Sequence, residues 1–281
     1  MKVTAIYHYP IKSCGAIALD AAELDDSGVL DDRRLMLVAP DGTFLSQARH
    51  PRLALVHPKV HGDVLEVTGS ETEPLSLSID EHGKEVSADF WFDQIAVVDQ
   101  GDVAADWFSE FLDTECRLVM TGAEFDRSPP AEGVLTSQQR RFTDAGNVHL
   151  TTDSSLAELN DRLKQPVGMD RFRPNIVVDG GAPFEEDCWK KLRIGSVELN
   201  ATITCERCSI VSTNQQTGIR EKEPLKTLAA YRKFDGGFGS GVLFGTHLDV
   251  DTPGRIQIGD TVEVVERGQL LGAQPRREVQ S

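Results

Sequence analysis

The sequence predicts an α+β fold that is predominantly β, built as two β-barrel-like domains with a few helices packed outside. Two observations predict it: short strand-like runs are numerous, and stretches of helical periodicity are few. A third is the aperiodic segment 122–141, which divides the chain. We therefore expect an N-terminal domain at 1–121, a second domain at 122–268 and a polar tail at 269–281.

The sequence of the first domain predicts a strand followed by hairpins. The start of the chain, 1–6, alternates apolar and polar residues as a half-buried strand does. Three turn signatures then separate paired apolar runs, and each contains Gly beside Asp, Pro or His. The paired strands are expected at 35–38 with 43–45, at 53–60 with 64–67, and at 75–79 with 85–92.

Helical periodicity occurs in three places. Apolar residues recur at spacings of three and four from Val103 to Leu112, which predicts an amphipathic helix of about three turns. A second helix is expected after Asp153 as its N-cap, and a short third helix from Pro224 to Arg232. The remaining strands are expected at 147–151, 175–178, 192–194, 197–203, 242–250, 255–258 and 261–265.

Composition excludes several classes of protein. The 281 residues carry a net charge of −16, which argues against a general nucleic-acid or anionic-membrane surface. No apolar run approaches the roughly 20 residues of a membrane span, and no signal core opens the chain, so we expect a cytoplasmic protein. Five scattered cysteines do not form a disulfide framework, and reduced thiols are expected.

The run Cys205-Glu206-Arg207-Cys208 lies between one strand and a second strand expected to start at 209–211. A four-ligand zinc site is disfavoured because there is no second Cys-x-x-Cys pair and the histidines are scattered. A thioredoxin-like pair would open a helix, so that interpretation is also weak. From these four residues alone, two core cysteines are the leading interpretation. Arg207 favours a thiolate beside it.

Basic and polar residues cluster at several strand ends. Arg171-Phe172-Arg173-Pro174-Asn175 precedes the strand at 175–178, and Tyr9-Pro10-Ile11-Lys12-Ser13 follows the first strand. Both runs can direct donors at an anion, although neither has the Gly-rich pattern of a P-loop. Phe142-Thr143-Asp144-Ala145-Gly146 is a polar turn before a strand. His149 alternates with apolar neighbours, which favours a core or rim histidine over a catalyst.

Taken in order, these motifs resemble the MOSC family, which includes molybdenum-cofactor sulfurase C-terminal domains and amidoxime reductases. The likeness covers nearly the whole chain and is greatest to amidoxime-reducing component-like molybdenum proteins. The first two motifs resemble the family's N-terminal β-barrel domain and the rest its MOSC domain. They are 9–13, Asp32-Arg33-Arg34, 173–178, Glu186-Asp187 with Trp189, Cys205-x-Arg-Cys208, Thr217-Gly218, Glu223-Pro224-Leu225 and Leu243-Phe244-Gly245.

The resemblance implies a molybdopterin-type cofactor whose molybdenum is bound by one protein thiolate, that of Cys208, which would be both metal ligand and catalytic residue. Thiolate is a soft ligand suited to such a metal site. Arg33 is favoured over Arg34 because Asp32-Arg33 matches the family pattern. The cofactor-binding residues implied are Lys12, Ser13, Arg33, Thr143, Asp144, Ala145, Arg173, Asn175, Glu206 and Arg207, with Cys205 as a structural neighbour.

The resemblance also implies an oxidoreductase that reduces N-hydroxylated compounds by oxygen-atom transfer to molybdenum. No cysteine follows Cys208, so electrons are expected from a separate cytochrome b5-like, ferredoxin-like or flavin reductase partner. The alternative is a sulfur-carrier or cofactor-binding module with a persulfide on one cysteine of the run. It would act with a partner enzyme, for example a pyridoxal phosphate-dependent one. A redox-inactive barrel with core thiols is the third interpretation.

Overall fold

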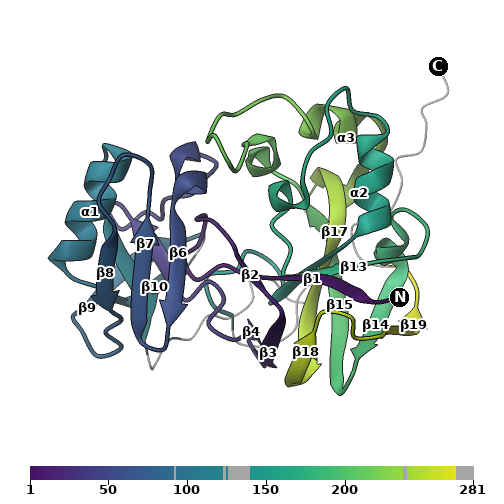
Figure 1. The fold of residues 1–281 in the computed structure, drawn as a ribbon, viewed down its shortest axis with the longest axis horizontal. Helices are drawn as coiled ribbons and strands as arrows, with labels where there is room; N and C mark the ends of the chain where they lie inside the picture. Colours follow the sequence, from purple (N-terminus) through teal and green to yellow (C-terminus); the bar gives the residue numbers. More distant parts are fainter. Residues whose placement is uncertain (92, 123–124, 126–139, 237–238, 270–281) are drawn as a thin grey trace.

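The computed structural model describes residues 1–91, 93–122, 125, 140–236 and 239–269. This part of the chain is mostly β, as the sequence predicts, and it forms two lobes that lie side by side (Figure 1). The helices lie at the outside of the lobes, again as expected. No helix among the described residues is long and apolar enough to cross a membrane.

The larger sheet contains most of the second half of the chain. Its order is β19-β14-β15-β17-β12-β13-β1-β2, with β16 beside β17, and β12 and β13 are its parallel pair. Its buried face is almost wholly aliphatic, with Trp189 at one end. The strands are β1 (Val3–His8), β2 (Ile17–Leu19), β12 (Val148–Thr152), β13 (Ile176–Val178), β14 (Trp189–Ile194), β15 (Val197–Glu206), β16 (Lys233–Gly236), β17 (Gly239–Thr252) and β19 (Val262–Arg267).

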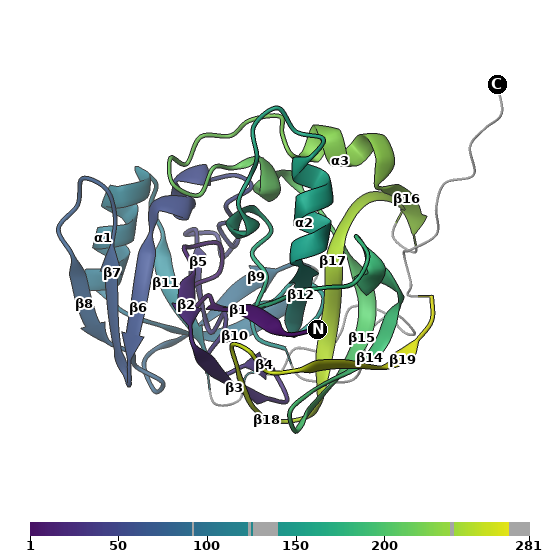
Figure 2. The ribbon, with the colours of Figure 1, turned by 45° about the vertical axis from the view of Figure 1, so that its right-hand side comes forward.

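Strand β1 belongs to this larger sheet although it opens the chain. It pairs antiparallel with β13, where Ile6 faces Ile176, and the Tyr7 amide donates to the Asn175 carbonyl at 2.8 Å. Figure 2 shows β1 lying between the two lobes. The segment that follows β1 is therefore placed at the junction of the lobes.

The described part of the chain also forms three smaller sheets. Their orders are β5-β11-β10-β9, β6-β7-β8 and β18-β3-β4. The hairpin β6–β7 turns through Gly62 and Asp63, as predicted, with His61 paired to Val64. The strands are β3 (Ala21–Asp25), β4 (Gly28–Val29), β5 (Leu35–Val38), β6 (His57–His61), β7 (Val64–Thr68), β8 (Leu75–Ser78), β9 (Glu85–Phe90), β10 (Asp93–Asp99), β11 (Arg117–Thr121) and β18 (Gly254–Gln257).

The described residues contain three α-helices, close to where the sequence predicts them, at α1 (Asp102–Leu112), α2 (Asp153–Asn160) and α3 (Leu225–Tyr231). Helix α1 buries Phe108 and Phe111 against the first lobe's core. The predicted cap of α2 is wrong by one residue, because the Thr152 hydroxyl accepts from the Ser155 amide. Short 3₁₀ helices occur at η1 (Pro51–Leu55), η2 (Met169–Arg171), η3 (Glu185–Cys188) and η4 (Ser209–Ser212).

Several strand predictions are wrong in detail. The expected strand 53–60 begins with η1, because Pro51 starts a helical turn that buries Leu53 and Ala54. The strand expected at 209–211 is η4, so the cysteine run joins a strand to a 3₁₀ helix. Residues 43–45 form only isolated bridges. Strands β2, β3, β4, β10, β11 and β16 had no sequence prediction.

Candidate cofactor site

Three predicted segments meet at the junction of the lobes. The Arg33 amide donates to the Tyr9 carbonyl at 2.8 Å, and the Arg33 Nη1 donates to Asn175 Oδ1 at 3.1 Å. Asn175 also donates through Nδ2 to the Tyr7 carbonyl at 3.2 Å and accepts from the His149 amide at 3.1 Å. Asn175 is thus a buried connection between β1, β12 and the Arg33 loop, and it fixes their relative positions.

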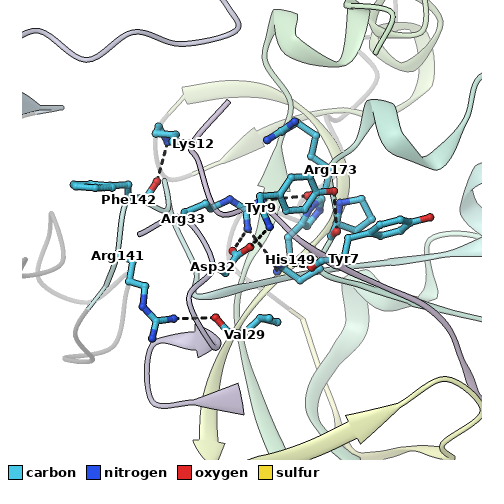
Figure 3. Close-up of polar contacts among 12 residues, drawn as sticks. Tyr7, Tyr9, Lys12, Val29, Asp32, Arg33, Arg141, Phe142, His149 and Arg173 are labelled. Carbon is cyan, nitrogen blue, oxygen red and sulfur yellow. Dashed lines mark hydrogen bonds and ion pairs between the residues drawn. The ribbon is translucent and has the colours of Figure 1, made fainter. Parts of the chain in front are cut away.

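Two guanidinium groups flank the ring of Tyr9 (Figure 3). The Cζ atoms of Arg33 and Arg173 lie 4.5 and 4.4 Å from the ring centroid, and the Tyr9 hydroxyl donates to the Pro174 carbonyl at 3.0 Å. Burial raises the pKa of Tyr9, so the ring stays neutral between the two cations. Arg34 points elsewhere, to Asp31 and Glu81, so Arg33 is the arginine of this pair in the cluster.

The charges in this cluster are not balanced. Arg33 pairs with the buried Asp32, whose other oxygen accepts from the Tyr9 amide at 2.7 Å. Arg173 donates to the Cys14 carbonyl at 2.7 Å, and it contacts no carboxylate in the described residues. It is 9% exposed, and burial lowers its pKa. A buried cation beside a second one is costly unless an anion joins them.

Lys12 extends the basic cluster toward the polar turn before β12. Its Nζ donates to the Phe142 carbonyl at 3.0 Å and to Asp144 Oδ1 at 2.5 Å, and it lies 4.9 Å from the Phe90 ring centroid. Although burial alone would raise it, the Lys12 charge lowers the pKa of Asp144 to about 2. Thr143 beside it is buried and Ala145 is half-buried.

Four non-glycine residues of this region have left-handed backbone. They are Ser13 (φ 69°), Arg33 (φ 51°), Trp91 (φ 59°) and Arg173 (φ 53°). Such angles cost free energy for residues with a Cβ, and they persist where surrounding structure imposes them, often at functional sites. Three of the four were predicted as cofactor residues from the sequence.

The cysteine run is connected to the same cluster. Arg207 Nη1 lies 2.8 Å from the Cys205 sulfur and 3.4 Å from His149 Nε2, and Nη2 donates to the Phe172 carbonyl at 2.8 Å. His149 Nδ1 lies 3.4 Å from the Arg173 carbonyl oxygen. Burial alone would raise the pKa of Cys205, but Arg207 and His149 lower it to about 7. Cys205 therefore lies in a thiolate-stabilising environment.

The other members of the run lie differently. Cys208 is exposed and is the N-cap residue of η4. Glu206 is exposed at the end of β15, and its side chain lies against Gly241 of β17, where a Cβ would be 2.4 Å from the carboxyl carbon. Within the described residues, no group of three His, Cys, Asp or Glu side chains could hold a metal ion. A metal bound here would need ligands beyond the side chains of the described residues.

Two histidines were not recognised as site residues from the sequence. The rings of His149 and His247 lie 5.3 Å apart, and His247 Nδ1 is buried without a hydrogen-bond partner. Burial lowers the pKa of His247 to about 3, so the ring is neutral at pH 7. Both alternate with apolar residues along their strands, a pattern that indicates the core and gives no sign of a site. Trp91 was also missed, since it ends an ordinary strand pattern.

Two domain models match most of the chain. The MOSC N-terminal β-barrel domain matches residues 1–115, and the MOSC domain matches residues 137–263. The chain belongs to the MOSC family. Two domain models thus account for most of its length, and the basic cluster draws on both matched ranges.

Individual relatives align with nearly the whole chain. The chain is 35% identical over 277 residues to mitochondrial amidoxime reducing component 2 of Rattus norvegicus, covering 92% of this chain and 82% of that protein. It is 31% identical over 284 residues to the human mitochondrial amidoxime-reducing component 1, with the same coverage. It is also 30% identical to a molybdenum cofactor sulfurase of Oryza sativa, covering 96% of this chain but 35% of that longer protein.

Proposed function

We propose that this MOSC protein binds a molybdenum cofactor and reduces N-hydroxylated compounds, with electrons delivered by a separate protein. The observation that carries the proposal is the unbalanced buried charge of Arg173 beside Arg33, connected through His149 to Arg207 and the cysteine run. The names of the amidoxime-reducing relatives support the reaction class.

The residues present fit the phosphate of a pterin cofactor. Arg173 lacks a carboxylate partner in the described structure, and Arg207 Nε is buried with no hydrogen-bond partner. Guanidinium groups bind phosphate oxygens with two parallel hydrogen bonds. We assign phosphate binding to Lys12, Ser13, Arg33 and Arg173, with the turn Thr143-Asp144-Ala145 alongside and Asn175 holding Arg33 in place.

Cys208 is the proposed metal ligand because it is the accessible thiol of the run. The side chain of its neighbour Arg207 contacts Cys205, His149 and the Phe172 carbonyl. These contacts restrain the backbone that leads to Cys208. Glu206, two residues before it, is exposed. When bound, the cofactor would supply oxygen-atom-transfer chemistry: two electrons would go to the N–O bond of the substrate, two electrons and two protons from the donor protein would replace them, and the oxygen would leave as water. The protein's part is to bind the anion, hold the thiolate and orient the group.

Two cysteine variants test this assignment. The full chain is produced in a host that makes molybdenum cofactor, and molybdenum and pterin per chain are measured. N-reduction of a simple aryl amidoxime is then assayed with dithionite and a mediator dye, which removes the need for the natural donor. Cys208→Ser should abolish turnover while circular dichroism stays unchanged, and Cys205→Ser should retain molybdenum. Amidoxime reduction by Cys208→Ser would overturn the assignment.

A second candidate function rests on Cys205. Its thiolate-stabilising contact with Arg207 is what a persulfide carrier would need, and one relative is named a molybdenum cofactor sulfurase. In this case the protein would deliver sulfur or cofactor to a partner enzyme, for example a pyridoxal phosphate-dependent enzyme. Cyanide-releasable sulfur on the wild type, lost in Cys205→Ser and present without molybdenum, would favour this function over the first.

A further inference from the structure

Trp91 is a large aromatic side chain held in an exposed position beside the basic cluster. It follows β9, and 54% of its surface is exposed to solvent. Its indole Nε1 donates to Asp144 Oδ1 at 3.1 Å, the same oxygen that accepts from Lys12 Nζ. The indole nitrogen and the Lys12 ammonium are therefore only a few ångströms apart. An aromatic surface thus adjoins the proposed phosphate-binding residues.

The left-handed backbone conformation of Trp91 costs free energy, so some interaction must favour a tryptophan at this position. A bulky residue at φ 59° is a true backbone outlier, whereas glycine would adopt this angle freely. A tryptophan that covered the apolar core would be buried, but more than half of the surface of Trp91 is exposed. Phe44 lies 5.5 Å from it with ring planes tilted at 53°, so the neighbouring aromatic supports it from the side. Strain of this kind commonly marks a binding residue.

Asp144 has further acceptor capacity next to this ring. Its Oδ1 accepts from Lys12 and Trp91, and its Oδ2 accepts no hydrogen bond from the described part of the chain. The Asp144 side chain is 54% exposed. A carboxylate oxygen can accept two hydrogen bonds, so Oδ2 can receive N–H groups from a ligand. The Lys12 ammonium, the aromatic face of Trp91 and the Asp144 Oδ2 acceptor together suit a ligand that is a planar heterocycle carrying a phosphate.

We propose that Trp91 is a stacking platform for the pterin ring of the cofactor, while Asp144 Oδ2 accepts hydrogen bonds from the N–H edge of that ring. This inference rests on the proposed function, because it places the ring next to the phosphate site formed by Lys12 and its neighbours. Stacking a fused heterocycle on tryptophan uses the aromatic surface that the strained backbone keeps exposed.

The test uses three variants of the full chain and a pterin monophosphate as the probe. Trp91→Gly removes the ring and suits the left-handed backbone, so it should not impair folding. Trp91→Phe keeps a stacking face but loses the bond to Asp144. Trp107→Phe is the control, since Trp107 lies on α1 and donates to the Glu73 carbonyl. Probe affinity, tryptophan emission and thermal unfolding are measured for each.

The expected pattern is specific to one tryptophan. Wild type and Trp107→Phe should bind the probe with saturable quenching, and Trp91→Gly should bind roughly 10-fold or more weakly, with that quenching lost. Trp91→Phe should fall between them. Equal affinity in wild type and Trp91→Gly would overturn the stacking role alone. No pterin binding by wild type, together with no molybdenum in the purified protein, would overturn the proposed function as well.

Discussion

Arg207 Nη1 lies 2.8 Å from the sulfur of Cys205, in the interior beside His149. The contact links the first and third residues of the cysteine run to the basic cluster at the lobe junction. It explains why two cysteines three residues apart differ so much: one is buried against a cation and the other is exposed. Their chemistry should therefore be separable by mutation.

The first prediction concerns the Cys205 thiolate. In a Cys208→Ser background, Arg207→Gln should raise the pKa of Cys205 from about 7, because the lowering charge is removed while burial, which raises it, remains. Thiolate absorbance near 240 nm, followed against pH, measures the change, and Cys205→Ser supplies the baseline. An unchanged titration curve would show that Arg207 does not stabilise the thiolate.

A second prediction separates an unpaired cation from a paired one. Arg173→Gln should leave the unfolding free energy of the cofactor-free chain unchanged or raised, because it removes a buried charge without a carboxylate partner. The same variant should lower cofactor content. Arg232→Gln is the matched contrast, since Arg232 pairs with the buried Asp187 at 2.5 Å.

Breaking that pair should cost roughly 3 kcal/mol, because a buried charge is left alone. Urea unfolding and pterin content together measure both effects. If Arg173→Gln destabilised the cofactor-free chain as much as Arg232→Gln does, Arg173 would be an ordinary structural cation.

A third prediction is a pH dependence of stability that originates at Glu186. Burial raises the pKa of this carboxyl to about 7, and both its oxygens accept from the Ser155 hydroxyl, at 2.7 and 2.9 Å. The folded state therefore binds the proton more tightly than the unfolded chain does. The stabilisation from protonated Glu186 is complete at low pH. It is lost as the pH rises from the pKa of Glu186 in the unfolded chain through its folded pKa of about 7.

Glu186→Gln should remove this dependence. Between pH 5 and pH 8, wild type should lose roughly 2 kcal/mol relative to the variant, as a shift of more than two pKa units requires. Urea unfolding at the two pH values measures the difference. Glu185→Gln is the control, since Glu185 pairs with Arg267 near the surface. Parallel curves for wild type and Glu186→Gln would contradict the assignment.

The fourth prediction concerns the contact between the lobes. Gln47 and Gln215 are buried and exchange two amide hydrogen bonds, at 3.1 and 3.0 Å, and Gln47 also donates to the Ser13 carbonyl. Single alanine variants should each cost roughly 1–3 kcal/mol, because each leaves a buried amide unpaired. A double-mutant cycle should give a coupling of at least 0.5 kcal/mol. The control is Gln216→Ala, at an exposed neighbouring position, which should change the free energy of unfolding little. A coupling energy near zero would show that the Gln47–Gln215 pair does not stabilise the contact between the lobes.

Part of the candidate site was accessible from the sequence. Lys12, Arg33, Arg173 and Asn175 were identified by motif and resemblance, and the structure places them within one connected cluster. Trp91 and His247 could not be found this way, because each continues the ordinary alternation of a strand. Their importance depends on which buried or charged groups face them across the fold.

Local features were determined by the sequence alone. The period of α1 and the two-residue turn between β6 and β7 depend on residues close together in the chain. Such patterns are set by backbone sterics and by the burial of one face, which act over a few residues.

Only the tertiary structure decided how distant segments meet. The pairing of β1 with β13 joins residues about 170 positions apart and brings Lys12 and Arg33 to Arg173. It also decided that Cys205 is the thiol buried against Arg207 and that Cys208 is exposed. No local pattern encodes these outcomes, because strand partners are selected by the total apolar burial of the whole sheet.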